Sequence, residues 1–377
     1  MWIGTKNANL VMPVETVAKR LDQGFRQIES SRIHLCPLDC ADDLPTMKFG
    51  VNTIQKLSPD ELETFIDSRR LVRTNSSWII DKIRFSKFNW LIVEERVLHD
   101  VKSGARVISD FFGSIDLSRD FGEIIPHKEK FPVAVENALF ALLLLPWEEL
   151  TSYGDFDWRG FRVPWVYTVD DDIFKRPAPP PSSDTLSWEP KIFSDQYGHA
   201  VELEVPVCLP LQNSANEKLR RLNDTTWSDL LRALDSPLFA TPIKHFLVRA
   251  FLSDDIDEFL AHITVIEAAL GLKIDFDAGS RPKIAQNKNP GATFRVATRL
   301  SRLLGRQSAA KEFQTLFKKR SEYLHGRKMI AIPSNNKILA RRLARETVEH
   351  LMMAALTIPS HKSRNKYLAD LLKTGLL

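Results

Sequence analysis

Residues 254–271 read DDIDEFLAHITVIEAALG, and this stretch decides the class of the C-terminal part of the chain. Ser253 and the carboxylates that follow it are typical of a helix start, because a hydroxyl can cap the first turn and acidic groups favour the positive end of a helix. Apolar side chains then recur at the spacing of a helix face that packs on a core. They are Ile256, Leu260, Ile263 and Leu270. We predict an amphipathic helix that ends near Gly271.

Further amphipathic segments lie on both sides of this stretch, separated by modest connections and by one polar loop, residues 273–291. The expected helices cover residues 238–252, 292–304, the segment that begins at Ser308, 335–358 and a short tail at 367–372. Four or five amphipathic helices joined in this way form a bundle. The sequence therefore predicts a helical bundle over residues 236–377.

The first part of the chain has short β-prone runs instead. Strands are expected at 78–80, 83–85, 90–93, 106–108, 161–169 and 201–209, with a helix at 137–150 and a proline-rich loop at 177–184. Proline inside the last two runs favours edge strands. Residues 1–235 are therefore predicted to form a mixed α/β or β-rich domain, with a sensor or regulatory role as one expectation. The expected fold class of the whole chain is α+β.

Composition restricts the class of protein further. The 377 residues are 44% hydrophobic and 27% charged, as in a soluble globular protein. No run approaches the roughly 20 apolar residues that span a bilayer, and the N-terminus lacks the pattern of a secretory signal. Three cysteines favour a reducing cytoplasm. Cys36 and Cys40 lie near His34 without an evident fourth ligand, so we expect no metal, no cofactor and no membrane partner.

The net charge of +4 hides a strong asymmetry. Residues 246–377 contain 23 Lys and Arg against 12 Asp and Glu, and residues 278–328 alone contain 13 against 2. Such a density is common on nucleic-acid-binding surfaces, although it also fits a solvated helix face or a patch that docks on the acidic first part of the chain. Four arginines at steps of four, three and four form one basic ridge on the expected helix and its end. They are Arg295, Arg299, Arg302 and Arg306.

Within this basic region, residues 320–325 read RSEYLH. Arg320 offers a permanent forked cation for a phosphate, and His325 can exchange a proton near neutral pH. On an ideal helix the two side chains point about 140° apart. They can converge if Gly326 ends the helix in a left-handed conformation, or if a second chain completes the site. Glu267 falls on the buried stripe of its helix, so it either pairs with a cation such as Arg320 or lies at the edge in water.

The segment from about residue 238 to 358 resembles a HEPN domain, specifically the subgroup of ApeA-type anti-phage proteins. The resemblance rests on DDIDEFLAHITVIEAALG, on RVATRLSRLLG after the loop, and on LFKKRSEYLHG. The family pattern is an arginine, a polar residue, three variable residues and a histidine. Arg320, Ser321 and His325 fill this pattern, and the resemblance covers about a third of the chain.

The resemblance implies a metal-independent endoribonuclease that acts as a homodimer in prokaryotic anti-phage defence or as a toxin. In that chemistry the RNA 2′-hydroxyl attacks the adjacent phosphorus and leaves a 2′,3′-cyclic phosphate. His325 would move the proton, Arg320 would hold the phosphate oxygens, and Ser321 and Glu267 would orient them. Expected RNA contacts are Lys318, Lys319, Tyr323, Arg327, Lys328, Arg295, Arg299 and Arg302.

Two other interpretations stay open. The bundle can be a non-catalytic HEPN module that binds nucleic acid or dimerises under control of the N-terminal domain. It can also be a helical interaction protein in which the motif is accidental, with Arg320 in an ordinary ion pair. A phage-derived trigger or an antitoxin is an expected partner in the first interpretation. The RNA that is cut and the identity of any trigger do not follow from the sequence.

Overall fold

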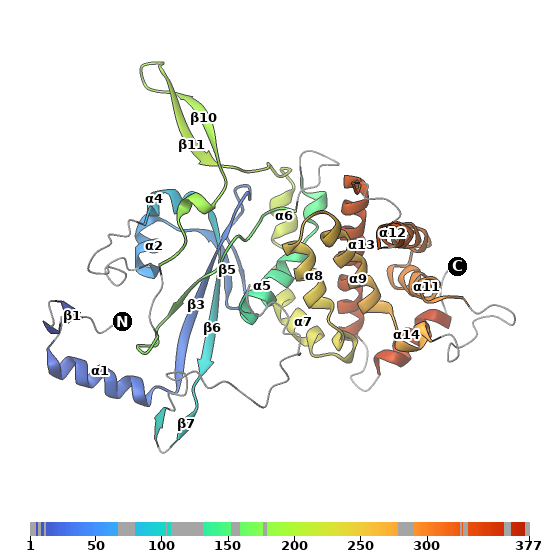
Figure 1. Ribbon diagram of the computed structural model, residues 1–377, viewed down its shortest axis with the longest axis horizontal. Helices are drawn as coiled ribbons and strands as arrows, with labels where there is room; N and C mark the ends of the chain where they lie inside the picture. The colour runs from blue at the N-terminus through green and yellow to red at the C-terminus, as the bar shows by residue number, and fades with distance from the viewer. Residues whose placement is uncertain are drawn as a thin grey trace. The chain divides into compact units, whose positions relative to one another are not determined.

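The computed structural model divides the chain into two compact units, each assembled from two stretches of sequence (Figure 1). Unit 1 consists of Met1–Val135 and Phe161–Leu209, and unit 2 consists of Glu136–Gly160 and Pro210–Leu377. The structure describes residues 5–6, 9–10, 13–66, 80–102, 104–106, 131–151, 159–175, 179–277, 290–324, 326, 331–357 and 363–373.

Unit 1 is built on a five-stranded antiparallel sheet with the order β4-β5-β6-β3-β9. The strands are β4 (Met47–Phe49), β5 (Asn52–Lys56), β6 (Asn89–Leu98), β3 (Glu29–Leu38) and β9 (Tyr167–Asp170). β9 forms one edge of the sheet, but it covers only the last part of the strand expected at 161–169, and Pro164 lies before it. The α+β class expected for the chain is confirmed by this sheet together with the helices of unit 2.

One face of this sheet carries an apolar core under two short helices, α2 (Pro59–Phe65) and α4 (Lys82–Phe85). Leu62 of α2 and Phe85 of α4 pack there with Leu35, Trp90 and Tyr167 from the strands. Because alternate residues of a strand face opposite sides, these strand positions belong to one face.

The strand expected at residues 83–85 is wrong, because the segment Lys82–Phe85 is helical. Asp81 explains the difference, since its side chain accepts a hydrogen bond from the backbone N–H of Arg84 at 2.9 Å and so caps a helical turn. Of the strand expected at 78–80, the structure describes only Ile80. Of the strand expected at 106–108, it describes only Arg106.

The rest of unit 1 consists of small elements around the sheet. They are β1 (Thr5–Lys6), β2 (Asn9–Leu10), α1 (Val14–Arg26), β7 (Val101–Lys102), β8 (Ala105–Arg106), η3 (Ser183–Thr185), β10 (Trp188–Ser194) and β11 (Ala200–Pro206). β10 and β11 pair as a separate antiparallel hairpin that extends away from the five strands in Figure 1. β11 confirms most of the strand that was expected at 201–209.

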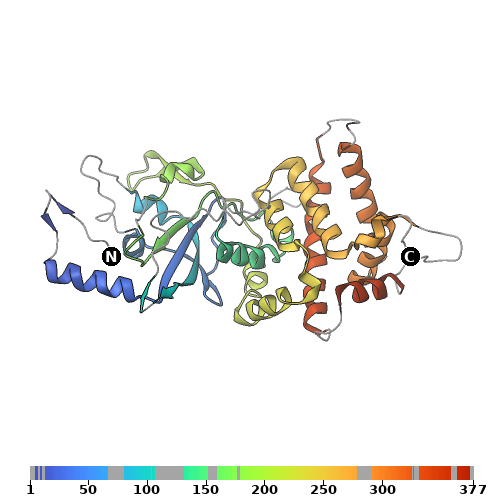
Figure 2. The same cartoon turned by 60° about the horizontal axis from the view of Figure 1, so that its bottom comes forward.

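Unit 2 is a helical bundle. Its elements are α5 (Val133–Leu143, which begins in unit 1), η2 (Trp147–Glu149), α6 (Ala215–Leu219), α7 (Asp224–Leu234), η4 (Pro237–Phe239), α8 (Ile243–Leu252), α9 (Asp255–Leu270), α10 (Lys273–Phe276), α11 (Ala292–Leu304), α12 (Ser308–Leu324), α13 (Ser334–Thr357) and α14 (Arg364–Lys373). α9 packs against α8 and α13, and α11 packs against α12 and α14 (Figure 2). The core contains Phe259, Ile263, Leu300, Phe313 and Leu343, all fully buried.

The division of the chain replaces the expected boundary at residue 235. The stretches 136–160 and 210–235 belong to the helical unit. In the second stretch α7 packs against α13, and in the first stretch charge pairing with α13 contributes. Arg345 of α13 is buried, and its guanidinium donates to Glu148 and Glu149 of η2 at 2.5 Å and 3.1 Å. A buried guanidinium needs such partners, and sequence patterns do not reveal a pairing across almost 200 residues.

The start of α9 differs from the expected cap. Ser253 does not cap the helix; its hydroxyl donates to the carbonyl of Arg249 at 2.8 Å and so closes α8. Asp254 is the residue before the first turn of α9. The acidic first turn itself is present, with Asp255, Asp257 and Glu258. The helix beginning was therefore predicted correctly within two residues, with a different residue at the cap.

Candidate functional site

The last turns of α12 bring Arg320 next to α9. The guanidinium Nη2 of Arg320 lies 3.6 Å from Oε2 of Glu267, and the side chains are 26% and 18% exposed. The guanidinium carbon also lies 5.2 Å from the ring centre of Phe317, one turn earlier on α12. The pairing of Arg320 with Glu267 that the sequence left open is thus present. A separation of 3.6 Å is an ion pair rather than a hydrogen bond, so Arg320 keeps donors for a ligand.

Glu267 is a carboxyl group in a partly apolar position. Burial raises the pKa of Glu267 above its ordinary value, and the charge of Arg320 opposes this rise without cancelling it. Glu267 therefore takes up a proton more readily than an exposed glutamate does. A carboxyl with this property is able to exchange protons closer to neutral pH, and it also anchors the arginine by charge.

Two other residues of the motif contact their own bundle. The hydroxyl of Ser321 donates to the backbone carbonyl of Phe317 at 3.0 Å, so this hydroxyl is directed along α12 instead of towards Arg320. The orienting role expected for Ser321 is not visible in this geometry. The ring of Tyr323 lies edge-on to that of Phe259, with 6.4 Å between the centroids, which matches packing on the bundle.

The conformation of Gly326 fits one of the two ways in which Arg320 and His325 were expected to converge, namely the end of the helix at this glycine. Its φ is +67°, in the left-handed region, and its N–H donates to the carbonyl of Tyr323 at 3.1 Å. α12 ends at Leu324, directly before the motif histidine. This matches the expectation that the helix terminates at this position. His325 itself, Arg327 and Lys328 lie outside the described residues.

Only some of the arginines in the basic ridge of α11 are exposed to solvent. Arg295 is 0% and Arg299 is 1% exposed, so neither is available to RNA, and the expectation that they contact RNA is wrong. Arg299 forms a buried ion pair with Asp275 of α10 and donates to the backbone carbonyls of Leu270 and Leu368 at 2.9 Å and 3.0 Å. Their positive charge stabilises the bundle instead of meeting a polyanion.

The remaining basic residues divide by exposure. Arg302 and Lys318 are exposed and Lys319 is half-buried, so these three are accessible as the RNA interpretation requires. Arg306 donates to Glu312 and Glu346 at 2.8 Å and 2.6 Å. The accessible positive surface of α11 and α12 is therefore smaller than the sequence count indicates.

The C-terminal end of α9 is a second place where arginine is structural. Arg364 of α14 donates to the carbonyls of Ala268, Ala269 and Gly271 at 2.7 to 3.2 Å. These carbonyls are the unpaired acceptors that every helix leaves at its negative end. Burial lowers the pKa of Arg364, and the nearby charge of Arg299 adds to that effect.

The cysteines and the metal expectation concern unit 1. Cys36 and Cys40 are buried free thiols, and His34 hydrogen-bonds Thr168 and Glu95 at 2.9 Å and 3.2 Å. The part of the chain that the structure describes contains no group of three or more His, Cys, Asp or Glu side chains arranged to hold a metal ion. In that same part, no helix combines the length and the apolar character needed to cross a membrane.

Comparisons with known proteins give no further guide to this site. The chain matches no protein-family model, no curated protein and no solved structure. Two sets of residues were missed by the sequence reasoning: Asp275, which neutralises Arg299, and the carboxylates around Arg345 on α13. The pair Glu148-Glu149 was visible as a local acidic signal after Pro146, but its partner was not.

Proposed function

We propose that the chain is a metal-independent endoribonuclease of the HEPN type, active as a homodimer in defence against phage or as a toxin. The observation that carries the proposal is the Arg320–Glu267 pair at the end of α12, where a partly exposed guanidinium lies beside a half-buried carboxylate. The left-handed Gly326 directly after the motif histidine adds support.

The proposed chemistry uses Arg320 and His325 as the catalytic residues. The guanidinium of Arg320 binds the non-bridging oxygens of the scissile phosphate and stabilises the charge that develops there. His325 takes the proton of the 2′-hydroxyl as the oxygen attacks phosphorus, and a proton is returned to the departing 5′-oxygen. The partner chain's motif lies across the same cleft in the proposed dimer and can supply that second proton transfer. The products are a 2′,3′-cyclic phosphate and a 5′-hydroxyl.

The supporting roles follow the described contacts. Glu267 acts through Arg320 in the proposal, as a positioning residue, since its ion pair is with Arg320. Lys318 and Arg302 are exposed and hold the RNA backbone in the proposal, which gives salt-sensitive binding with little dependence on base sequence. Arg295 and Arg299 have no part in RNA binding.

The test measures RNA cleavage by the full chain in EDTA, with the product ends identified as cyclic phosphates. His325→Ala and Arg320→Ala should each reduce the cleavage rate by about 100-fold or more, which is typical for loss of a proton-transfer group or a charge-stabilising donor. Arg249→Ala, at an exposed position of α8, should cleave like the wild type. Toxicity on expression should depend on His325 in the same way.

The outcomes separate the three interpretations. Cleavage that survives in both variants would remove this site from consideration. If the wild type and both variants bind RNA equally well, and none of them cleaves RNA in the assay or in cells, the non-catalytic scaffold would be favoured. Silence in the purified assay combined with toxicity that requires His325 would show that the enzyme needs a trigger.

A further inference from the structure

The β10–β11 hairpin of unit 1 leaves apolar side chains in water. Phe193, Val201 and Leu203 are 43%, 38% and 51% exposed. They share one face of the hairpin, because Phe193 lies opposite Val201 and alternate residues of a strand point to the same side. Two strands alone are only marginally stable in water, so an apolar face on such a pair indicates a surface that another chain segment covers.

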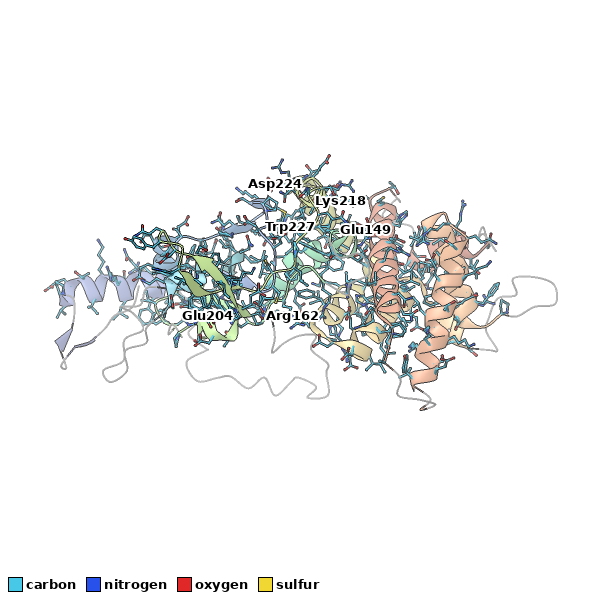
Figure 3. All side chains as sticks on the ribbon, turned by 90° about the horizontal axis from the view of Figure 1, so that it is seen from above. Glu149, Arg162, Glu204, Lys218, Asp224 and Trp227 are labelled. Carbon is cyan, nitrogen blue, oxygen red and sulfur yellow. The ribbon has the colours of Figure 1, made fainter. Side chains whose placement is uncertain are left out.

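The hairpin is nevertheless held in shape at both ends. At its base, the ring of Trp188 lies edge-on to that of Phe88 with 5.1 Å between the centroids, and the guanidinium carbon of Arg84 lies 4.1 Å from the Trp188 ring centre. Arg84 also pairs with Glu204, labelled in Figure 3, at 3.0 Å. At the turn, the side chain of Asp195 accepts two backbone N–H groups, each at 2.8 Å. A binding surface that is ordered in advance loses less entropy when a partner binds.

The hydrogen bonds between the two strands decide which backbone groups face outwards. The N–H of Asp195 donates to the carbonyl of His199 at 2.9 Å, and that of Val207 donates to the carbonyl of Ser187 at 3.0 Å. Hydrogen-bonded pairs alternate along antiparallel strands, so in this register the odd-numbered residues bond across the hairpin. The even-numbered residues therefore direct their N–H and C=O groups to the two outer edges.

The outer edge of β11 suits an added strand better than that of β10. Pro190 is an even-numbered residue of β10, and because it has no N–H it interrupts any ladder along that edge. On β11, Ala200 and Glu202 are exposed and direct both backbone groups outwards. The carbonyl of Glu204 already accepts a hydrogen bond from Nζ of Lys87 at 3.2 Å, so the free edge ends there.

Glu202 determines the charge of a suitable strand. Its side chain is exposed and forms no ion pair with any residue that the structure describes. It points to the face opposite to that of Val201 and Leu203, because side chains alternate along a strand. An added strand would place one side chain beside Glu202 and the two neighbouring side chains beside Val201 and Leu203. A positive charge is favoured at the first position and apolar groups at the other two.

A second copy of this chain fits the edge poorly. In the antiparallel register with the greatest overlap along residues 200–204, Glu202 would lie opposite its own counterpart. Like charges directly opposite each other destabilise a strand pair. The charge of the edge therefore favours a different, basic partner.

We propose that the outer edge of β11 binds an extended segment of a partner protein as a third strand, in which a lysine or arginine lies between two apolar residues. The basic side chain pairs with Glu202, and the apolar side chains extend the apolar face of Val201 and Leu203. The backbone of the segment bonds to Ala200 and Glu202, as in other cases of strand addition to a sheet edge. The proposal concerns binding by unit 1 and does not rest on RNA cleavage by unit 2, so the failure of either leaves the other intact.

The experiment titrates the full chain into a fluorescein-labelled peptide, Gly-Thr-Val-Lys-Val-Thr-Gly, and follows the anisotropy. The order of side chains in this peptide is the same in both directions, so it fits a parallel or an antiparallel strand. It should bind with a dissociation constant below about 1 mM. The same peptide with glutamate in place of lysine should bind at least about fivefold more weakly, because an attractive pair with Glu202 becomes a repulsive one.

Variants connect the binding to this edge. Glu202→Lys should reverse the preference, so that the glutamate peptide binds more tightly than the lysine peptide by about fivefold. Glu202→Pro removes an outward N–H together with the charge and should weaken the lysine peptide at least about tenfold. Ile192 lies opposite Glu202 on β10, so Ile192→Pro is the matched control and should bind like the wild type. Proline at these even-numbered positions leaves the bonds across the hairpin in place, as Pro190 does, and hydrogen exchange on a peptide of residues 188–206 checks this.

Four results would overturn the proposal. The first is the absence of measurable binding of the lysine peptide to the wild type. The second is equal binding of the lysine and glutamate peptides, or a preference that Glu202→Lys does not reverse. The third is a loss of affinity in Ile192→Pro as large as that in Glu202→Pro. The fourth is self-association of the chain in sedimentation experiments that Glu202→Pro abolishes, which would identify a second copy as the occupant of the edge.

Discussion

Asp275 is the residue whose replacement should destabilise unit 2 most directly. It is 0% exposed and neutralises Arg299, which is 1% exposed. Asp275→Asn keeps the size of the side chain and removes its charge. The guanidinium of Arg299 would then remain buried with neutral acceptors alone, and loss of one partner of a buried ion pair typically costs about 3–5 kcal/mol.

The structure places the expected cost at the lower end of that range. Arg299 keeps its hydrogen bonds to the carbonyls of Leu270 and Leu368, and an asparagine oxygen can still accept the N–H of Leu272, which Asp275 accepts at 2.9 Å. We therefore expect Asp275→Asn to lower the free energy of unfolding by about 3 kcal/mol. With a urea m-value of about 3 kcal/mol/M, the midpoint of unit 2 should fall by about 1 M.

The assay combines urea unfolding followed by tryptophan fluorescence with hydrogen exchange measured on peptides of α10 and α11. Exchange is needed because two units can unfold separately, so that one midpoint does not describe the chain. Asp257→Asn is the matched control, since this aspartate is exposed on α9, and it should change stability by less than about 0.5 kcal/mol.

A double variant tests the physical reason. Asp275→Asn with Arg299→Met replaces the ion pair by uncharged groups, and such replacements are often close to neutral. The double variant should therefore recover most of the lost stability. If Asp275→Asn unfolds at the wild-type midpoint, or if adding Arg299→Met lowers stability further, Arg299 is not a buried charge that depends on Asp275.

Three more changes address single features of unit 2. Gly160 has φ +87° and a Cβ there would lie 2.3 Å from the ring of buried Trp147, so Gly160→Ala should cost about 3 kcal/mol in the same urea assay. Gly326 also has a positive φ, but no atom lies within 4 Å of a Cβ placed there, so Gly326→Ala should cost about 1 kcal/mol. If Gly160→Ala and Gly326→Ala cost the same, the steric argument is refuted. Because burial raises the pKa of Glu267, its contribution to stability is full below 4.5, its ordinary value, and is lost as pH rises through the higher folded value. The free energy of unfolding of Glu267→Gln, measured from pH 4 to 8, should not show this loss. If the free energies of the wild type and the variant run parallel over this pH range, the raised pKa is contradicted.

Helix positions were predictable from sequence because each depends on local periodicity. α11 begins and ends at the expected residues, 292 and 304, and α13 is displaced by one residue. Gly305 explains the first case, since its φ of +66° ends the helix where the apolar repeat stops. Such signals lie within a few residues of the feature that they determine.

Charge placement was less predictable, since it depends on contacts between distant segments. Arg299 and Arg302 are three residues apart in one basic ridge, yet Arg299 is buried and Arg302 is exposed. The difference comes from Asp275, which lies 24 residues before Arg299 in the chain and has no periodic relation to it. The Arg320–Glu267 pair was accessible to sequence reasoning because Glu267 interrupts an apolar stripe and therefore needs a partner.

The discontinuity of unit 2 has a consequence for its synthesis. Glu148 and its partner Arg345 are 197 residues apart, and the second segment of unit 1 is made between them. At about 5–20 residues per second, a ribosome needs roughly 10–40 seconds to cover that interval. Residues 136–160, the first segment of the helical unit, are therefore synthesised before the last strands of unit 1 and remain without the rest of their own unit during that time. Every nascent chain therefore carries all residues of unit 1 before it carries a complete helical bundle, so any site in the bundle is completed after unit 1.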